Sequence, residues 1–179
     1  AFAKLAERLG AAAIIVEGNE AGGHLGTDEP LRSIFPGIRD VVKNIPLIAA
    51  GGISDGLEMA EIMDKYGADG VQIATRFVMT KECDVSDEFK QAFVDAGKDD
   101  VSLMHSPVGM PGRAIRNKFI ERLSVQDKSL RPEECEFKCL KKCDYTFCIN
   151  DRLNRSAIKG DADGGLIFSG EKVYKFNEI

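Results

Sequence analysis

Long apolar runs and a surplus of basic residues are both missing from this chain of 179 residues. The longest apolar runs, residues 11–16 and 45–50, are far too short to cross a bilayer. The formal net charge of −5 argues against nucleic acid or an anionic membrane as a partner, since both require basic patches. The chain opens without a signal-peptide pattern, and its five cysteines are an odd number, so we expect reduced thiols in the cytoplasm.

Nucleotide-binding signatures are missing as well. The glycine-rich stretches "GGHLG" and "GGISDG" both lack the G-x-G-x-x-G spacing, and the chain contains no Walker A lysine motif. A dinucleotide-binding Rossmann domain is therefore a poor interpretation of this chain.

Helical and strand patterns alternate in the first half of the chain. Helical spacing of apolar residues covers 2–9 and 31–42, and a capping pair, Asp55 and Glu58, precedes a third helix that Gly67 ends. Between them lie apolar strand-like runs at 11–16, 45–50 and 70–74. The alternation predicts an α/β fold with right-handed βαβ units and a parallel sheet.

Two of the predicted strands end in loops rich in glycine or small residues. "AAGGI" at 49–53 and "ATR" at 74–76 lie one βα repeat apart. Neighbouring loops of this kind can grip one phosphate through backbone N–H groups, although each loop alone could simply let a strand turn into a helix. As a pair they favour a phosphate site at Gly51, Gly52, Ala74 and Thr75. For Arg76 we expect pairing with a neighbouring helix rather than a phosphate contact.

Four ordered motifs, "EGNEAGGHLG", "IPLIAAGGISDG", "GADGVQIATRF" and "SPVGMPGRAIRN", resemble those of the nitronate monooxygenases, formerly called 2-nitropropane dioxygenases. These flavoproteins are close to the flavin-dependent enoyl-acyl-carrier-protein reductases. The resemblance runs from about residue 11 to 117 and implies an FMN-binding (β/α)₈ TIM barrel. Ala74 departs from the glycine usual in the family.

A complete TIM barrel needs about 250 residues, and only three barrel strands are convincing here. We expect the chain to be the C-terminal part of a longer protein, with the N-terminal half of the barrel supplied by another chain or lying outside this sequence. Residues 1–123 would hold about the last three strands and their helices, and residues 124–179 a small cysteine-containing appendage.

The resemblance implies a catalytic role for His24, which would lie beside the flavin and remove a carbon-bound proton from a nitroalkane or steady the anionic nitronate. A lone loop histidine facing solvent is the alternative. Gly22 and Gly23 would let the backbone lie against the flavin. Glu17 and Gln72 would face the flavin ring, or else be a solvated carboxylate and a buried amide.

The appendage contains Cys135, Cys139, Cys143 and Cys148. The first three have i, i+4, i+8 spacing, which predicts one face of a helix. The four thiols could ligate zinc or an iron–sulfur cluster, but the spacing is not a standard metal pattern, so we assign no metal. Residues 166–169 and 173–176 are expected to form a terminal hairpin.

Three functions remain open at this point. The first is FMN-dependent oxidation of alkyl nitronates by molecular oxygen, and the second is an FMN-dependent enoyl-acyl-carrier-protein reductase using reduced nicotinamide. The third is a non-catalytic fragment or a metal-binding module built on the four cysteines. For either enzyme the partner is a small-molecule substrate, and a homo-oligomer is allowed.

Overall fold

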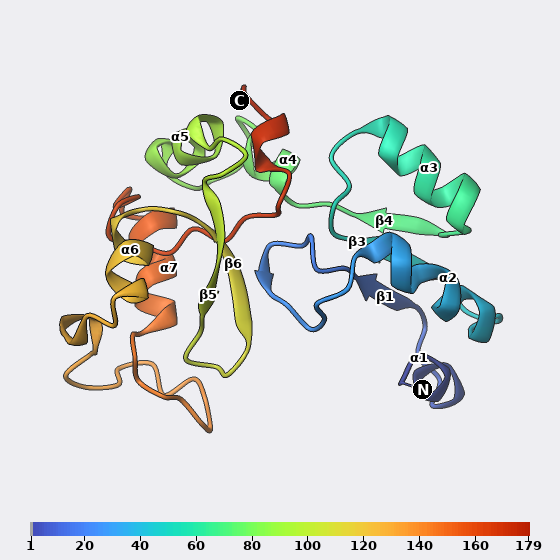
Figure 1. Ribbon diagram of the computed structural model, residues 1–179, viewed down its shortest axis with the longest axis horizontal. Helices are drawn as coiled ribbons and strands as arrows, with labels where there is room; N and C mark the ends of the chain where they lie inside the picture. The colour runs from blue at the N-terminus through green and yellow to red at the C-terminus, as the bar shows by residue number, and fades with distance from the viewer. Residues whose placement is uncertain (1) are drawn as a thin grey trace.

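The computed structural model describes residues 2–179 and contains two small sheets that lie side by side (Figure 1). The first sheet is parallel, with the order β1 (Ile14–Glu17), β3 (Leu47–Ala50), β4 (Gly70–Gln72). In its register Val16 pairs with Ala49, and Ala49 pairs in turn with Val71. The predicted α/β fold, a partial barrel with three successive parallel strands, is confirmed.

Three helices accompany this sheet: α1 (Phe2–Arg8), α2 (Leu31–Val41) and α3 (Gly56–Tyr66). The predicted signals of α3 are present, since Asp55 Oδ1 accepts the Glu58 N–H at 2.8 Å and Gly67 ends the helix with φ of 72°. The Glu58 side chain does not complete a capping box with Asp55. It accepts the N–H of Ser54 at 2.7 Å instead.

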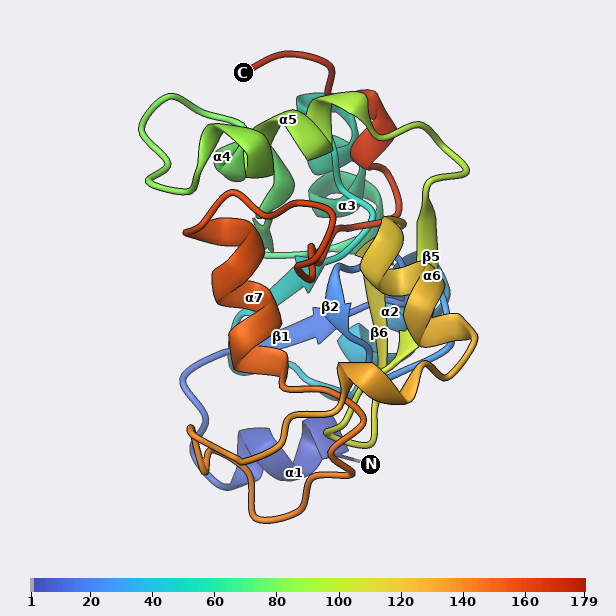
Figure 2. The ribbon, with the colours of Figure 1, turned by 90° about the vertical axis from the view of Figure 1, so that its left-hand side faces the viewer.

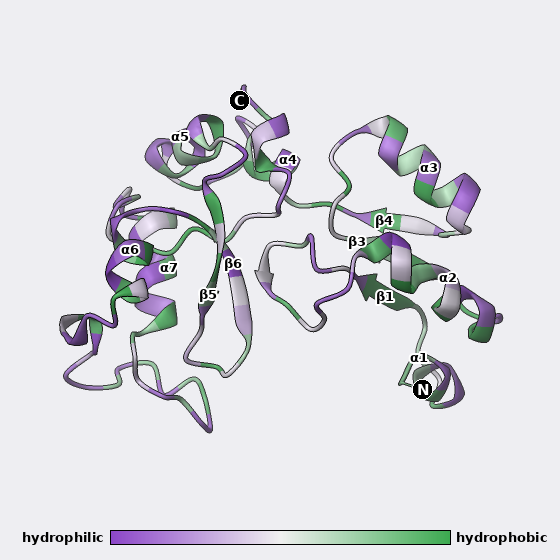
Figure 3. Cartoon of the chain, in the orientation of Figure 1, coloured by the Kyte–Doolittle hydropathy of each residue, from purple (hydrophilic) through white to green (hydrophobic). Residues whose placement is uncertain are grey.

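One face of the parallel sheet is covered and the other is open. Val16, Leu47 and Ala49 pack with Leu31 and Phe35 of α2 in a buried cluster. Residues that alternate with these along the strands point the other way: the Ile15 side chain is 54 % exposed although β1 is apolar throughout its first three residues (Figure 3). An uncovered apolar face of this kind is what three strands of an unclosed barrel present.

The second half of the chain is built differently. Its sheet is antiparallel, and β6 pairs with both the short β2 (Gly23–His24) and β5 (Val101–His105). The elements of this half are α4 (Thr75–Val78), α5 (Asp87–Asp95), β5, β6 (Pro111–Ile115), α6 (Lys118–Ser124), η1 (Lys128–Leu130), α7 (Ile149–Ala157) and η2 (Val173–Lys175). Figures 1 and 2 show α6 and α7 on the side of this sheet that faces away from the parallel sheet.

The hydrophobic packing of the second half crosses the predicted boundary at residues 123 and 124. Met79 and Phe93 share a buried cluster with Ile167 and Val173, and Phe119 shares another with Phe147 and Leu166. The division of the chain at this point stays a prediction, but residues 147–173 supply core side chains to the residues before it.

Two predictions of local structure in the C-terminal region are wrong. The segment that carries Cys135, Cys139 and Cys143 is an irregular loop, and Lys138, between the first two, has a φ of 45° that no α-helix accommodates. The expected hairpin does not form either. Phe168 makes an isolated bridge with Ala114 of β6, and Val173–Lys175 is a 3₁₀ helix.

Within residues 2–179 we find no helix that is long and apolar enough to span a membrane.

Candidate active site

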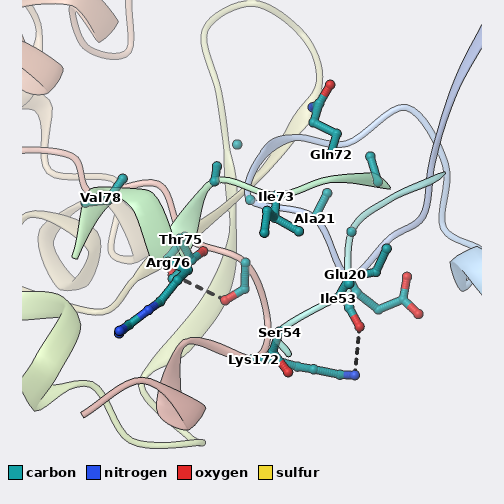
Figure 4. Close-up of a pocket in the computed structure, with 18 of the residues that line it drawn as sticks. Glu20, Ala21, Ile53, Ser54, Gln72, Ile73, Thr75, Arg76, Val78 and Lys172 are labelled. Carbon is teal, nitrogen blue, oxygen red and sulfur yellow. Dashed lines mark hydrogen bonds between the residues drawn. The ribbon is translucent and has the colours of Figure 1, made fainter. Parts of the chain in front are cut away.

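A cavity of about 360 Å³ lies at the carboxyl ends of the parallel strands (Figure 4). Its wall consists of the loops that follow β1, β3 and β4, closed on one side by the C-terminal segment around Ser169 and Lys172. The structure places all eight residues predicted to bind the cofactor along this wall: Glu17, Gly22, Gly23, Gly51, Gly52, Gln72, Ala74 and Thr75. The carboxyl ends of parallel strands meet at one edge of the sheet, which brings these distant residues together.

The loop after β3 has a backbone conformation that requires glycine. Gly51 and Gly52 have φ of 91° and 65°, in the left-handed region that L side chains rarely adopt. A Cβ on Gly51 would also lie 3.0 Å from the backbone nitrogen of Ala21. Within residues 2–179, the N–H groups of Gly52, Ile53 and Thr75 have no hydrogen-bond acceptor. Consecutive N–H groups without partners are a suitable arrangement for an anion.

The loop after β1 needs its two glycines for two different reasons. A Cβ on Gly22 would lie 2.6 Å from the carbonyl carbon of Ser169, so the C-terminal segment can approach only a glycine here. A Cβ on Gly23 would meet no other atom within 4 Å, but the φ of 83° at this position lies in the left-handed region that favours glycine. The close approach that we expected between Gly22 and a ligand is thus, in the structure, an approach between two segments of the chain.

His24 lies at the end of β2, beside the cavity rather than in its wall. Its Nε2 is 2.7 Å from Oγ of Ser106, which is fully buried, and its ring meets the ring of Phe168 edge-on with centroids 5.2 Å apart. The neighbours Gly23 and Phe168 both line the cavity. Partial burial lowers the pKa of His24 below its ordinary value, so the ring is neutral at neutral pH.

Glu17 and Gln72 end strands β1 and β4 at the cavity wall. Burial raises the pKa of the Glu17 carboxyl, because removal from water disfavours the charged form. Gln72 is exposed, so its amide is available to a ligand and is not satisfied inside the protein as in the alternative considered above.

A cluster of paired charged side chains lies at the end of the cavity beside Gly52. Lys172 Nζ donates to the Gly52 carbonyl oxygen at 2.7 Å (Figure 4). It also forms an ion pair with Glu58. Lys172, Lys175 and Ser54 all donate to the Glu58 carboxylate and hold its pKa at about 2, overcoming the opposite effect of burial. Arg76 also lines the cavity, and within the described residues it forms no ion pair, so the expected pairing with a neighbouring helix is absent.

Four residues of this region were missed by sequence reasoning: Ile53, Ser106, Phe168 and Lys172. Ser106 belongs to the quoted motif "SPVGMPGR" and could have been proposed as a partner for His24 from that motif. No pattern in the sequence indicates Phe168 or Lys172, because both reach the site from a segment without regular structure.

The cysteine-rich loop is not part of this site. All five cysteines are free thiols. No group of three or more His, Cys, Asp or Glu side chains in residues 2–179 is placed to hold a metal ion. His105 pairs with Asp144 at 2.6 Å, which ties this loop to the end of β5.

Comparison with known proteins identifies the family to which this chain is similar. The family model described as "Nitronate monooxygenase" matches residues 1–179. A "Probable nitronate monooxygenase" of Staphylococcus saprophyticus is 34 % identical over 178 residues, which cover 92 % of this chain and 46 % of the relative. The "(3aS,4S,5R,7aS)-5-hydroxy-7a-methyl-1-oxo-octahydro-1H-indene-4-carboxyl-CoA dehydrogenase" of Mycobacterium tuberculosis is 40 % identical over 118 residues, which cover 64 % of this chain and 32 % of the relative.

Among solved structures, FabK from Thermotoga maritima matches with a TM-score of 0.78 and 31 % identity, covering 99 % of this chain and 52 % of the FabK chain. The chain thus spans between a third and about half of the length of the proteins it matches.

Proposed function

This chain belongs to the nitronate monooxygenase family, a family of oxidoreductases, and we propose that it supplies the phosphate-binding and proton-transfer part of an FMN-dependent enzyme that oxidises alkyl nitronates with molecular oxygen. The observation that carries the proposal is that one cavity is lined both by the loops whose N–H groups have no acceptor within residues 2–179 and by Gly23 and Phe168, the neighbours of His24.

The residues present suit a flavin mononucleotide. The phosphate would be held by the N–H groups of Gly52, Ile53 and Thr75, in a loop where a Cβ at Gly51 would collide with the backbone of Ala21. A volume of about 360 Å³ is at the lower end of the range of ligand sites. The N-terminal half of the protein would complete the site. Bound flavin supplies the transfer of electrons between substrate and oxygen.

His24 is the residue of this chain that we assign to proton transfer. It is neutral at neutral pH, because its pKa is lowered. When Ser106 Oγ accepts the hydrogen of Nε2, the other ring nitrogen, Nδ1, has a free lone pair. Nδ1 can then take the carbon-bound proton of a neutral nitroalkane, which leaves the nitronate anion and an imidazolium. Ser106 fixes the tautomer and the orientation of the ring in this scheme.

A second candidate is reduction of an enoyl thioester with reduced nicotinamide, in which His24 would orient or protonate the thioester. The M. tuberculosis relative supports the thioester part of this candidate, since its name describes a dehydrogenase, an enzyme that oxidises its substrate, of a carboxyl-CoA compound. Both functions use the same flavin loops.

One measurement on the complete protein separates these functions. The visible spectrum is recorded, ethylnitronate is added under air, and NADH is added to a second sample without oxygen. We expect a flavin spectrum, turnover of ethylnitronate and no reaction with NADH. Rapid bleaching of the flavin by NADH would favour the reductase, and a protein without flavin would overturn both.

A further inference from the structure

The C-terminal strap, residues 168–176, crosses from the antiparallel sheet to the loops around the cavity. It is bound to both sides. The Ser169 N–H donates to the Arg113 carbonyl oxygen of β6 at 3.3 Å, and the Glu171 N–H donates to the Glu20 carbonyl oxygen at 3.0 Å. The strap is therefore held in place by the backbone before any of its side chains is considered.

Lys172 is the side chain of the strap that reaches the loop after β3. Its ammonium group donates to the Gly52 carbonyl oxygen at 2.7 Å. Because the peptide unit is planar, holding this carbonyl also fixes the direction of the Ile53 N–H on the same unit. That N–H is one of the groups without an acceptor in the described part of the chain. Lys172 thus orients a candidate phosphate donor through the backbone of the loop.

Glu58 holds Lys172 in this position. One carboxylate oxygen of Glu58 accepts the N–H and the hydroxyl of Ser54, both at 2.7 Å, and the other accepts Lys172 and Lys175. Lys175 also lies 3.6 Å from Asp55 Oδ2, so the two ammonium groups are balanced by two carboxylates, and of these Glu58 alone holds Lys172. The ion pair with Glu58 keeps the ammonium group of Lys172 against the Gly52 carbonyl oxygen.

We infer that Lys172 is a positioning residue for the cofactor phosphate: through the Gly52 carbonyl it sets the N–H groups that bind the phosphate, and it makes the site select phosphorylated flavin. This inference rests on the proposed function. It adds a specific recognition element, contributed by the strap, to a site otherwise built from strand-end loops.

The test compares FMN with riboflavin, which lacks the phosphate, in the complete protein. Dissociation constants are measured by quenching of flavin fluorescence for the unaltered protein and for Lys172→Met. We expect FMN binding to weaken by at most about a hundredfold, because the hydrogen bond between Lys172 and the Gly52 carbonyl oxygen limits what its loss can pass on to the phosphate, while riboflavin binding stays the same. Equal losses for the two flavins, or no loss for either, would overturn the inference and leave the proposed function standing.

Lys175→Met is the matched control. It removes the same charge from the same carboxylate, since Lys175 donates to Glu58 at 2.9 Å, and it also removes the 3.6 Å ion pair with Asp55. No contact with Gly52 is lost. Lys175→Met is expected to lose less FMN binding than Lys172→Met. Lys172→Arg should retain most of the FMN affinity of the unaltered protein. Equal losses in the two methionine variants would assign the effect to charge alone and overturn the role of the carbonyl contact. If the unaltered protein binds neither flavin, the proposed function fails, and this inference fails with it.

Discussion

Residues 2–74 and residues 75–179 differ in how far along the chain their packing partners lie. In the first region, the buried cluster draws only on residues between Val16 and Ala68, and each helix covers strands next to it in sequence. In the second region, Ile115 donates its N–H to Ile167, and Met79 packs against Val173. In the first region, strands and helices pack against elements that are close to them in sequence. The second is stabilised by contacts between distant segments, and the candidate site lies where the two regions meet.

This difference has a consequence for function. The first region supplies the glycine loops and His24, and the second supplies Ser106, Phe168 and Lys172. Neither region alone contains a donor loop together with the groups that orient it. The largest loss of activity is therefore expected from changes in the pair of His24 and Ser106, which joins the two regions.

His24→Ala should reduce turnover of a neutral nitroalkane by about a hundredfold to ten-thousandfold, the usual contribution of a general base. Turnover of pre-formed nitronate should fall far less, since no proton has to be removed. In the unaltered protein, turnover of the nitroalkane should rise with pH through a pKa below 6.5, because burial lowers the pKa of His24. The measurement is steady-state kinetics with both substrates across this pH range.

The control for His24 lies in the other region. Ser106→Ala keeps the base but removes the contact that orients it, so turnover of the nitroalkane should fall by less than in His24→Ala. Turnover by the double variant should be no lower than that of His24→Ala alone. Equal losses with nitroalkane and nitronate in His24→Ala would remove the assignment of this residue as a base.

Leu166 tests whether residues 124–179 are an appendage or part of the core. Leu166 is fully buried against Phe119 and Phe147. We expect Leu166→Ala to lower the free energy of unfolding by about 2–5 kcal/mol, as for other buried leucines. The measurement is denaturant unfolding of the complete protein, with Leu57→Ala as the control, because Leu57 is 84 % exposed. A change no larger than that of the control would show that this segment packs only loosely.

The two regions also differ in how much of each the sequence could reveal. Asp55 and Gly67 mark the ends of α3 through signals within a few residues, and Gly51 and Gly52 follow a strand directly, so these features were predictable. The cysteines show the opposite. Their i, i+4, i+8 spacing is helical, but the loop that contains them follows Pro132 and includes Lys138 at φ of 45°. Phe137 and Leu140 of this loop are 42 % and 37 % exposed, so the segment has no buried apolar face that would stabilise a helix.

The position of Lys172 could not be predicted for a related reason. Its contact with Gly52 joins residues that lie far apart in the chain, and it depends on the close approach of Ser169 to Gly22. Each of these residues is ordinary in its own sequence context. Only the three-dimensional path of the strap brings them together.

A smaller effect is expected from the ion pairs that join the two regions. The pKa of Glu58 is about 2, below the ordinary 4.5, so its charged form stabilises the folded protein above pH 4.5 and this contribution is lost as the pH falls towards 2. Glu58→Gln should therefore lower the free energy of unfolding by up to about 3 kcal/mol at neutral pH, and the difference should shrink as the pH falls. Unfolding curves at several pH values measure it.

Glu61 provides the comparison within one region. It pairs with Arg32 at 2.7 Å, and both residues belong to helices of the first half. Glu61→Gln should have little effect, because its carboxylate is exposed to solvent. If the two glutamine variants behave alike, the ion pairs of the strap contribute no more than a surface pair, and the two regions are held together by apolar packing and backbone hydrogen bonds.

The smallest effect is expected from Cys139→Ser, in the cysteine-rich loop away from the cavity. Cys139 is exposed and free, and no group of metal-ligating side chains surrounds it within residues 2–179. The flavin content of the purified protein, read from its visible spectrum, should match that of the unaltered protein. Elemental analysis for zinc and iron in both proteins is the second readout. A metal present in the unaltered protein and lost in the variant would contradict this expectation and make the loop a functional unit separate from the flavin site.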